Sequence, residues 1–137
     1  MTSTITYLGN LRTEAEHLKS GTKIITDAPT DNNGKGEAFS PTDLVATALG
    51  SCALTIMGIA ARNHGIDMVG TEVAINKIME AEPRRIGKVE VVITLPANGY
   101  AKKDRKILEA AAHGCPVGRS IQDGIEDMTI IWLDDKV

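Results

Sequence analysis

The chain has 137 residues, of which 42% are hydrophobic and 24% charged, and its formal net charge at pH 7 is −3. These values fit one ordinary globular domain, residues 1–137, that is large enough to bury a hydrophobic core. A slightly acidic chain with scattered positive charges gives no reason to expect a nucleic acid or a membrane surface as a partner. The first residues lack the basic flank and apolar centre of a signal peptide, so we expect a cytoplasmic protein.

Strand patterns precede and follow a long helical stretch. Alternating residues and the turn dipeptides Gly9-Asn10 and Ser20-Gly21 predict strands at residues 4–8, 11–18 and 22–26. After the helical stretch, the same alternation predicts strands at residues 72–80, 85–95 and 128–133, and apolar spacing predicts a helix at 101–113. Residues 27–39 show no periodicity, and a loop of this length in a compact domain is often functional.

The central helix is predicted over residues 41–63. Ser40 is a favourable N-cap, Pro41 suits the first helical position, and Asp43 places a carboxylate in the first turn. Arg62 then adds a cation to the last turn, where it complements the helix dipole.

Residues 44–61 of this helix carry no charge. An uncharged stretch of this length is long enough that a membrane span must be considered. Many of these residues are small, however, and no aromatic belt flanks them. We therefore expect a helix that protein covers on every side. Small residues such as Ala46 and Gly50 would let another backbone approach closely, for example the same helix of a second copy.

Two cysteines carry the candidate chemistry, and cytosolic cysteines are more often free thiols or a redox pair than a structural bridge. Cys52 lies in the central helix, where a cysteine usually serves as a small apolar residue. Cys115 stands between Gly114 and Pro116, so it is predicted to be the N-cap of another helix, where unpaired amides favour a thiolate. An unperturbed thiol is only about 3% ionised at pH 7, so thiol chemistry needs such help.

We expect no metal ion and no cofactor. Cys52 and His64 are 12 residues apart on one helix, hence about 18 Å, which is too far to share an ion. His113 and Cys115 could approach each other, but no second pair has chelating spacing. Residues 34–36, Gly-Lys-Gly, lack the length and the following Ser or Thr of a phosphate-binding loop.

Two sequence motifs are typical of a known protein family. Residues 40–52 read Ser-Pro-Thr-Asp-Leu-Val-Ala-Thr-Ala-Leu-Gly-Ser-Cys, and residues 115–117, whose cysteine lies 63 positions after Cys52, read Cys-Pro-Val. This combination resembles the OsmC/Ohr family of osmotically inducible and organic-hydroperoxide-resistance proteins, and the predicted elements follow that family's order along nearly the whole chain. The resemblance implies an α+β subunit with antiparallel sheets around a long buried central helix. It also implies an intertwined homodimer, with more than ~2,000 Å² buried in total.

The resemblance further implies a thiol-dependent peroxidase for organic hydroperoxides that acts in the oxidative stress response. Cys52 would be the peroxidatic thiolate that becomes a sulfenic acid, and Cys115 would resolve it to a disulfide that a dithiol reductant reopens. The two sulfur atoms should then lie within roughly 5 Å in the reduced protein. Two other functions stay open: a dimeric binding module for a lipid-like apolar ligand, and a thiol-disulfide regulator without turnover.

One position departs from the family's pattern. In the family an arginine activates the peroxidatic cysteine, and a glutamate ten residues before that cysteine holds the arginine. Arg12 is the best match to the arginine, but position 42 is Thr42. We therefore expect Arg12 to be mobile or only loosely directed at Cys52, and Thr42→Glu to favour the thiolate and speed its oxidation. Glu37 and Asp43 are the neighbouring carboxylates that could support the site instead.

Overall fold

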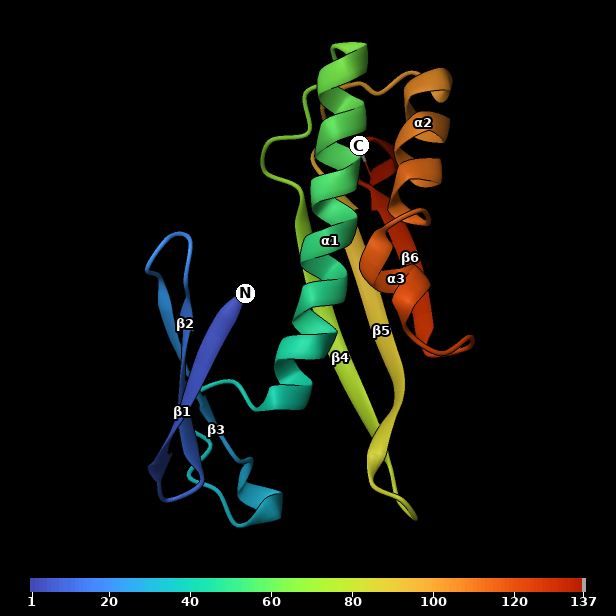
Figure 1. Cartoon of the computed structure of the whole chain (residues 1–137). Coiled ribbons are helices and arrows are strands. Elements are labelled where there is room, and N and C mark those ends of the chain that lie inside the picture. Colours follow the sequence, from blue (N-terminus) through green and yellow to red (C-terminus); the bar gives the residue numbers. More distant parts are fainter. Residues whose placement is uncertain (137) are drawn as a thin grey trace. The chain divides into compact units, whose positions relative to one another are not determined.

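The computed structural model describes residues 1–136, and Figure 1 shows the course of the chain. The fold class is α+β, as the sequence predicts. The chain forms two compact units, Met1–Val45 and Ala46–Val137.

The first unit is an antiparallel sheet in the order β1 (Ser3–Gly9), β2 (Arg12–His17) and β3 (Lys23–Asp27). These bounds confirm the predicted strands to within two residues. Cross-strand register places Ile5, Ala15 and Ile24 in one row. Ile5 is 67% exposed and Ile24 is 47% exposed. The first unit therefore leaves an apolar sheet face open within the single chain.

The helix α1 (Pro41–His64) begins with a reciprocal cap. The Asp43 amide donates to the Ser40 hydroxyl at 3.0 Å, and the Ser40 amide donates to the Asp43 carboxylate at 3.0 Å. Two amides without helical partners are thereby satisfied, which explains why the helix begins where the Ser-Pro-Thr-Asp sequence predicts.

The second unit holds a sheet in the order β4 (Glu72–Glu80), β5 (Arg85–Leu95) and β6 (Glu126–Trp132). β4 and β5 are antiparallel, but β6 runs parallel to β5. The expectation of purely antiparallel sheets is therefore wrong for this unit. The chain leaves the end of β5 and returns to the start of β6 through α2 (Lys102–Ala112) and α3 (Pro116–Ser120), a crossover that parallel strands require.

The helices α1 and α2 lie on the same face of this sheet (Figure 1). Their buried residues form one core with the inward residues of β5, namely Ala46, Leu49, Ala53, Met57, Ala61, Leu108, Ala112, Val89, Val91, Ile93 and Leu95. The strand β5 is thus the centre of the unit.

Within the single chain, α1 is covered on one side and not on all sides. Its buried residues follow a single helical stripe, whereas Ala48, Ser51, Thr55 and Ile59 form an exposed stripe, the open face of α1. Ala46 and Gly50 belong to the buried stripe, so their small size serves packing inside this chain. By length and composition alone, α1 could cross a membrane, a test that the core helix of a soluble protein also passes.

Gly50 supplies a direct test of this packing. A Cβ on Gly50 would lie 2.8 Å from Cδ1 of Ile75 and 3.0 Å from Cγ1 of Val73. We expect Gly50→Val to lower the free energy of unfolding by about 1–3 kcal/mol because it overpacks the contact with β4. Gly58 is the matched control on the same helix, since a Cβ there meets nothing within 4 Å.

Gly58→Ala should raise the stability by up to about 1 kcal/mol through helix propensity. Chemical denaturation of both variants checks the pair. A Gly50→Val protein as stable as the wild type would mean that α1 and β4 separate easily.

Candidate functional site

The second unit brings the two cysteines together. Cys52 is half-buried on α1, and Cys115, 1% exposed, lies in the core at the start of α3. Both are free thiols. The Cys52 side chain is close enough to the Cys115 thiol to contribute to raising its pKa. The two sulfur atoms are therefore neighbours although 63 positions separate them in the sequence.

Cys115 is the N-cap of α3, as predicted. The Gly118 amide donates a hydrogen bond to its Sγ at 3.2 Å. Burial nevertheless raises the pKa of the Cys115 thiol above its ordinary value, the Gly118 hydrogen bond opposes this, and Cys52 and Glu126 raise it further. The cap hydrogen bond favours the thiolate, as expected, but desolvation and neighbouring negative charge outweigh this one amide, so the pKa of Cys115 is raised overall.

Arg12 is held firmly at the edge of the first unit. Its Nε and Nη2 donate to the two carboxylate oxygens of Asp27 at 2.7 and 2.9 Å, and Nη2 also reaches Glu37 at 3.2 Å. The Asp27 side chain is only 1% exposed. Its carboxylate accepts a further hydrogen bond from the Glu37 amide at 3.1 Å. This bidentate arrangement fixes both the position and the orientation of the guanidinium group.

The pKa of Asp27 lies below its usual range, chiefly because of the hydrogen bonds from Arg12. The pKa of Arg12 rises in turn, again mainly because of its hydrogen bonds to Asp27. The expectation that Arg12 is mobile is therefore wrong. Asp27 supplies a carboxylate partner in the absence of a glutamate at position 42.

The other supporting candidates have different surroundings. Asp43 is engaged in the cap of α1, and Thr42 lies within hydrogen-bond distance of the Ser40 hydroxyl, at 3.2 Å. Glu37 contacts Arg12 but is 65% exposed.

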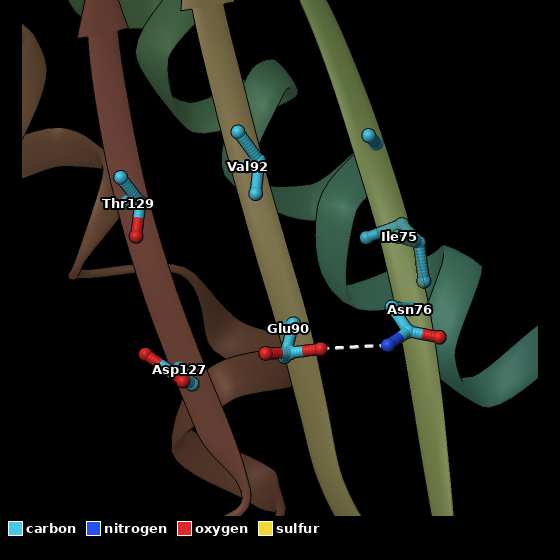
Figure 2. A pocket seen from close by; sticks show the side chains of 7 residues that line it. Ile75, Asn76, Glu90, Val92, Asp127 and Thr129 are labelled. Atoms are coloured by element: carbon cyan, nitrogen blue, oxygen red, sulfur yellow. Dashed lines mark hydrogen bonds between the residues drawn. The ribbon is translucent and has the colours of Figure 1, made fainter.

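A shallow pocket lies on the other face of the second sheet, away from the thiols. Figure 2 shows Asn76, Glu90 and Asp127 side by side on three strands, with a 2.6 Å hydrogen bond from Asn76 to Glu90. Val92 and Thr129 line its other end. Within residues 1–136, no group of three or more His, Cys, Asp or Glu side chains is arranged to hold a metal ion.

Together these features define an α+β protein with a pair of adjacent thiols, one on a long core helix and one capping a short helix. Residues 34–127 match the sequence pattern of the family described as OsmC-like protein. The chain belongs to this OsmC/Ohr family.

Solved structures extend the likeness to both units. A protein from Psychrobacter arcticus 273-4, provisionally named an osmotic stress induced and detoxification response protein, is 50% identical over 96% of this chain and 95% of its own, with a TM-score of 0.88. An OsmC-like protein of unknown function from Vibrio cholerae shares the fold at 15% identity over 94% of this chain and 97% of its own, with a TM-score of 0.78.

An organic hydroperoxide resistance protein from Legionella pneumophila shares the fold at 21% identity over 96% of each chain, with a TM-score of 0.67. No curated protein sequence matches the chain significantly.

Proposed function

We propose that the protein is a thiol-dependent peroxidase that reduces organic hydroperoxides through Cys52 and Cys115. The observation that carries this proposal is the proximity of the two thiols inside the second unit. Membership of the OsmC/Ohr family, and the names of structural neighbours such as the organic hydroperoxide resistance protein from Legionella pneumophila, support a role in redox stress. A cytoplasmic location, which would keep both thiols reduced, is part of the proposal.

The chemistry proceeds in two steps. The Cys52 thiolate attacks the distal oxygen of the hydroperoxide, the O–O bond breaks, and the alkoxide leaves as an alcohol once protonated; Cys52 becomes a sulfenic acid. The Cys115 sulfur then attacks the Cys52 sulfur, the S–O bond breaks, and water leaves. A dithiol reductant returns the resulting disulfide to two thiols.

Arg12 completes the proposal as the cation that favours the Cys52 thiolate, a role taken from the family resemblance. This role is supported by the hydrogen bonds that hold Arg12 in a fixed position. The Arg12 side chain is 30% exposed. A guanidinium group that is partly removed from bulk water needs a carboxylate partner, and Asp27 is that partner.

A homodimer is the proposed assembly. Two surfaces without charged side chains are exposed in the single chain. One is the open face of α1, and the other is the sheet face that carries Ile5 and Ile24. A helix without a polar face gains stability when a second copy covers it. The dimer would also cover part of the surface around Cys52 and so exclude water from the thiol.

We expect Ile59→Asp to convert a wild-type dimer to a monomer, because Ile59 is 53% exposed on the open face of α1. Burying an unpaired carboxylate against an apolar partner costs several kcal/mol. Sedimentation velocity at micromolar concentration gives the measurement. Ile78→Asp on β4 is the control, since Ile78 is 39% exposed on the outer face of the second sheet. A wild-type protein that sediments as a folded monomer would remove the dimer from the proposal.

The decisive experiment is consumption of cumene hydroperoxide with a dithiol present, for the wild type and Cys52→Ser. We expect multiple turnovers with the wild type and none with the variant. A single oxidation without turnover would instead indicate a thiol-disulfide regulator. No oxidation at all, with retention of an apolar ligand, would indicate a binding module.

A further inference from the structure

Glu126 breaks the pattern of the strand to which it belongs. Register with β5 pairs Glu126 with Val89, Met128 with Val91 and Ile130 with Ile93. These residues therefore share the face of the sheet that packs on the helices, and Glu126 is the charged member of that apolar row. Its side chain is 22% exposed, so the carboxylate sits at the rim of the core.

The space beside Gly118 joins this carboxylate to the buried thiol. A Cβ placed on Gly118 would lie 2.6 Å from Oε2 of Glu126 and 3.2 Å from Sγ of Cys115. The two atoms thus converge on the volume that glycine leaves empty. The Gly118 amide donates to the sulfur, so the sulfur is an acceptor in that contact and its S–H group remains available as a donor.

The second oxygen of Glu126 faces outward. Oε1 lies 4.0 Å from Nδ1 of His113, whose side chain is 59% exposed. The carboxylate therefore has one oxygen toward the thiol and the other toward a solvent-exposed imidazole. Glu126 therefore lies between the buried thiol and an imidazole that reaches solvent.

We propose that Glu126 is the proton shuttle of the resolving step, an inference that rests on the proposed function. Its carboxylate takes the proton of Cys115 while the Cys115 sulfur attacks the oxidised Cys52. The S–S bond forms, the S–O bond breaks, and Glu126 returns the proton to the departing hydroxide as water. No net proton is gained or lost.

The shuttle solves a problem that the surroundings of Cys115 create. Burial and adjacent negative charge keep Cys115 a thiol, and a thiol is a poor nucleophile. The leaving hydroxide also needs a proton. A carboxylate that transfers one proton from the nucleophile to the leaving group meets both needs.

If Glu126 acted only through its charge, its replacement would change the rate of disulfide formation in the opposite direction. Removing its charge would make the Cys115 thiolate more accessible and would speed disulfide formation. Removing a proton shuttle slows disulfide formation. General acid–base groups typically raise the rate of the step that they catalyse by about 10²–10⁴-fold. The direction of change therefore distinguishes the two roles.

The experiment is a single turnover of the full-length protein with cumene hydroperoxide, quenched in acid and followed by intact mass. The sulfenic acid adds one oxygen and the disulfide loses two hydrogens, so both steps are measured in one reaction. For Glu126→Gln we expect an unchanged rate of sulfenic acid formation and a disulfide step slower by about 10-fold or more. Asp127→Asn is the matched control, because Asp127 neighbours Glu126 but lines the pocket on the opposite face.

The pH profile adds a second measurement. The charged or titratable groups around the site are Cys52 on α1, His113 after α2, Arg119 on α3 and Glu126 on β6, while β5 presents only valines. Disulfide formation in Glu126→Gln should rise with pH more steeply than in the wild type, because Cys115 must then ionise unaided. His113→Gln is the variant that removes the imidazole beside Glu126.

The possible outcomes are distinct. A wild type that forms neither species means that the proposed function fails. A wild type that forms both, with Glu126→Gln resolving as fast or faster, overturns the shuttle alone.

Discussion

Asp27→Asn should slow the oxidation of Cys52 by an organic hydroperoxide by up to about 30-fold at pH 7. Asparagine has the shape of aspartate, but its single amide oxygen can accept only one of the two hydrogen bonds from Arg12, and its amide nitrogen would face the other donor. The guanidinium would lose the bidentate, charge-assisted pair of contacts of 2.7 and 2.9 Å that orients it. This factor is an upper bound from general thiol chemistry: an unperturbed thiol is about 3% ionised at pH 7, so a cation can raise the thiolate fraction by at most about 30-fold.

Glu37→Gln is the control for Asp27→Asn. Glu37 contacts Arg12 once, at 3.2 Å, from a side chain that is 65% exposed, so its loss should change the rate less than about threefold. Stopped-flow measurement of sulfenic acid formation, with titration of the thiolate absorbance, compares the variants. Because Asp27 already anchors Arg12, Thr42→Glu on the wild-type background should change the rate little. An Asp27→Asn protein as fast as the wild type would show that the anchored arginine does not serve Cys52.

The same contact gives the stability of the first unit a pH dependence. The folded-state pKa of Asp27 is depressed below its unfolded value, which is about 3.9. The stabilisation is therefore fully present above that value and is lost as the pH falls through the lower, folded pKa. Acid titration of the wild type should show this loss, and Asp27→Asn should lack it. Identical acid unfolding of the two proteins would contradict the assignment.

Cys115→Ser should abolish turnover while leaving the first oxidation of Cys52 intact. A serine hydroxyl at the start of α3 can still accept the Gly118 hydrogen bond that Cys115 accepts at 3.2 Å, so the local fold should be kept. The hydroxyl cannot form a disulfide, and the sulfenic acid of Cys52 would persist and then oxidise further to the sulfinic acid. Intact mass after excess cumene hydroperoxide should show gains of one and then two oxygens.

Serial additions of hydroperoxide with a dithiol check this result against Cys52→Ser. That variant should show neither oxygen gain nor turnover. A Cys115→Ser protein that turns over at the wild-type rate would mean that the dithiol attacks the sulfenic acid directly and that Cys115 has no resolving role.

Most of the fold is predictable from local sequence. Strand alternation, the turn dipeptides and the Ser40–Asp43 cap are short-range signals, and the structure confirms the elements that they predict. The Cys115-Pro116 sequence likewise predicts a cap, because both residues act within one turn. The parallel pairing of β5 and β6 has no such local signal, since it depends on how a long crossover closes.

The partner of Arg12 is the main feature of the site that sequence reasoning missed. The family's pattern places the partner of the arginine at position 42, where this chain has Thr42, and the nearby carboxylates are Glu37 and Asp43. Asp27 lies opposite Arg12 because β2 and β3 form an antiparallel pair around the Ser20-Gly21 turn. Counting outward from that turn would have found it. The raised pKa of Cys115 could not be predicted in this way, because burial depends on α1, α2 and β6 together.

The parallel pairing of β5 with β6 also bears on how the chain folds. β4 and β5 can pair early in folding, because a short turn joins them and few residues must be ordered. β6 can join only after residues 96–125 have closed as a loop, and such non-local contacts form slowly. Cys115 lies on that loop, so it reaches Cys52 only when the crossover has closed. A ribosome-bound chain that has exposed Cys52 but not yet Cys115 would therefore carry an oxidisable thiol without its resolving partner.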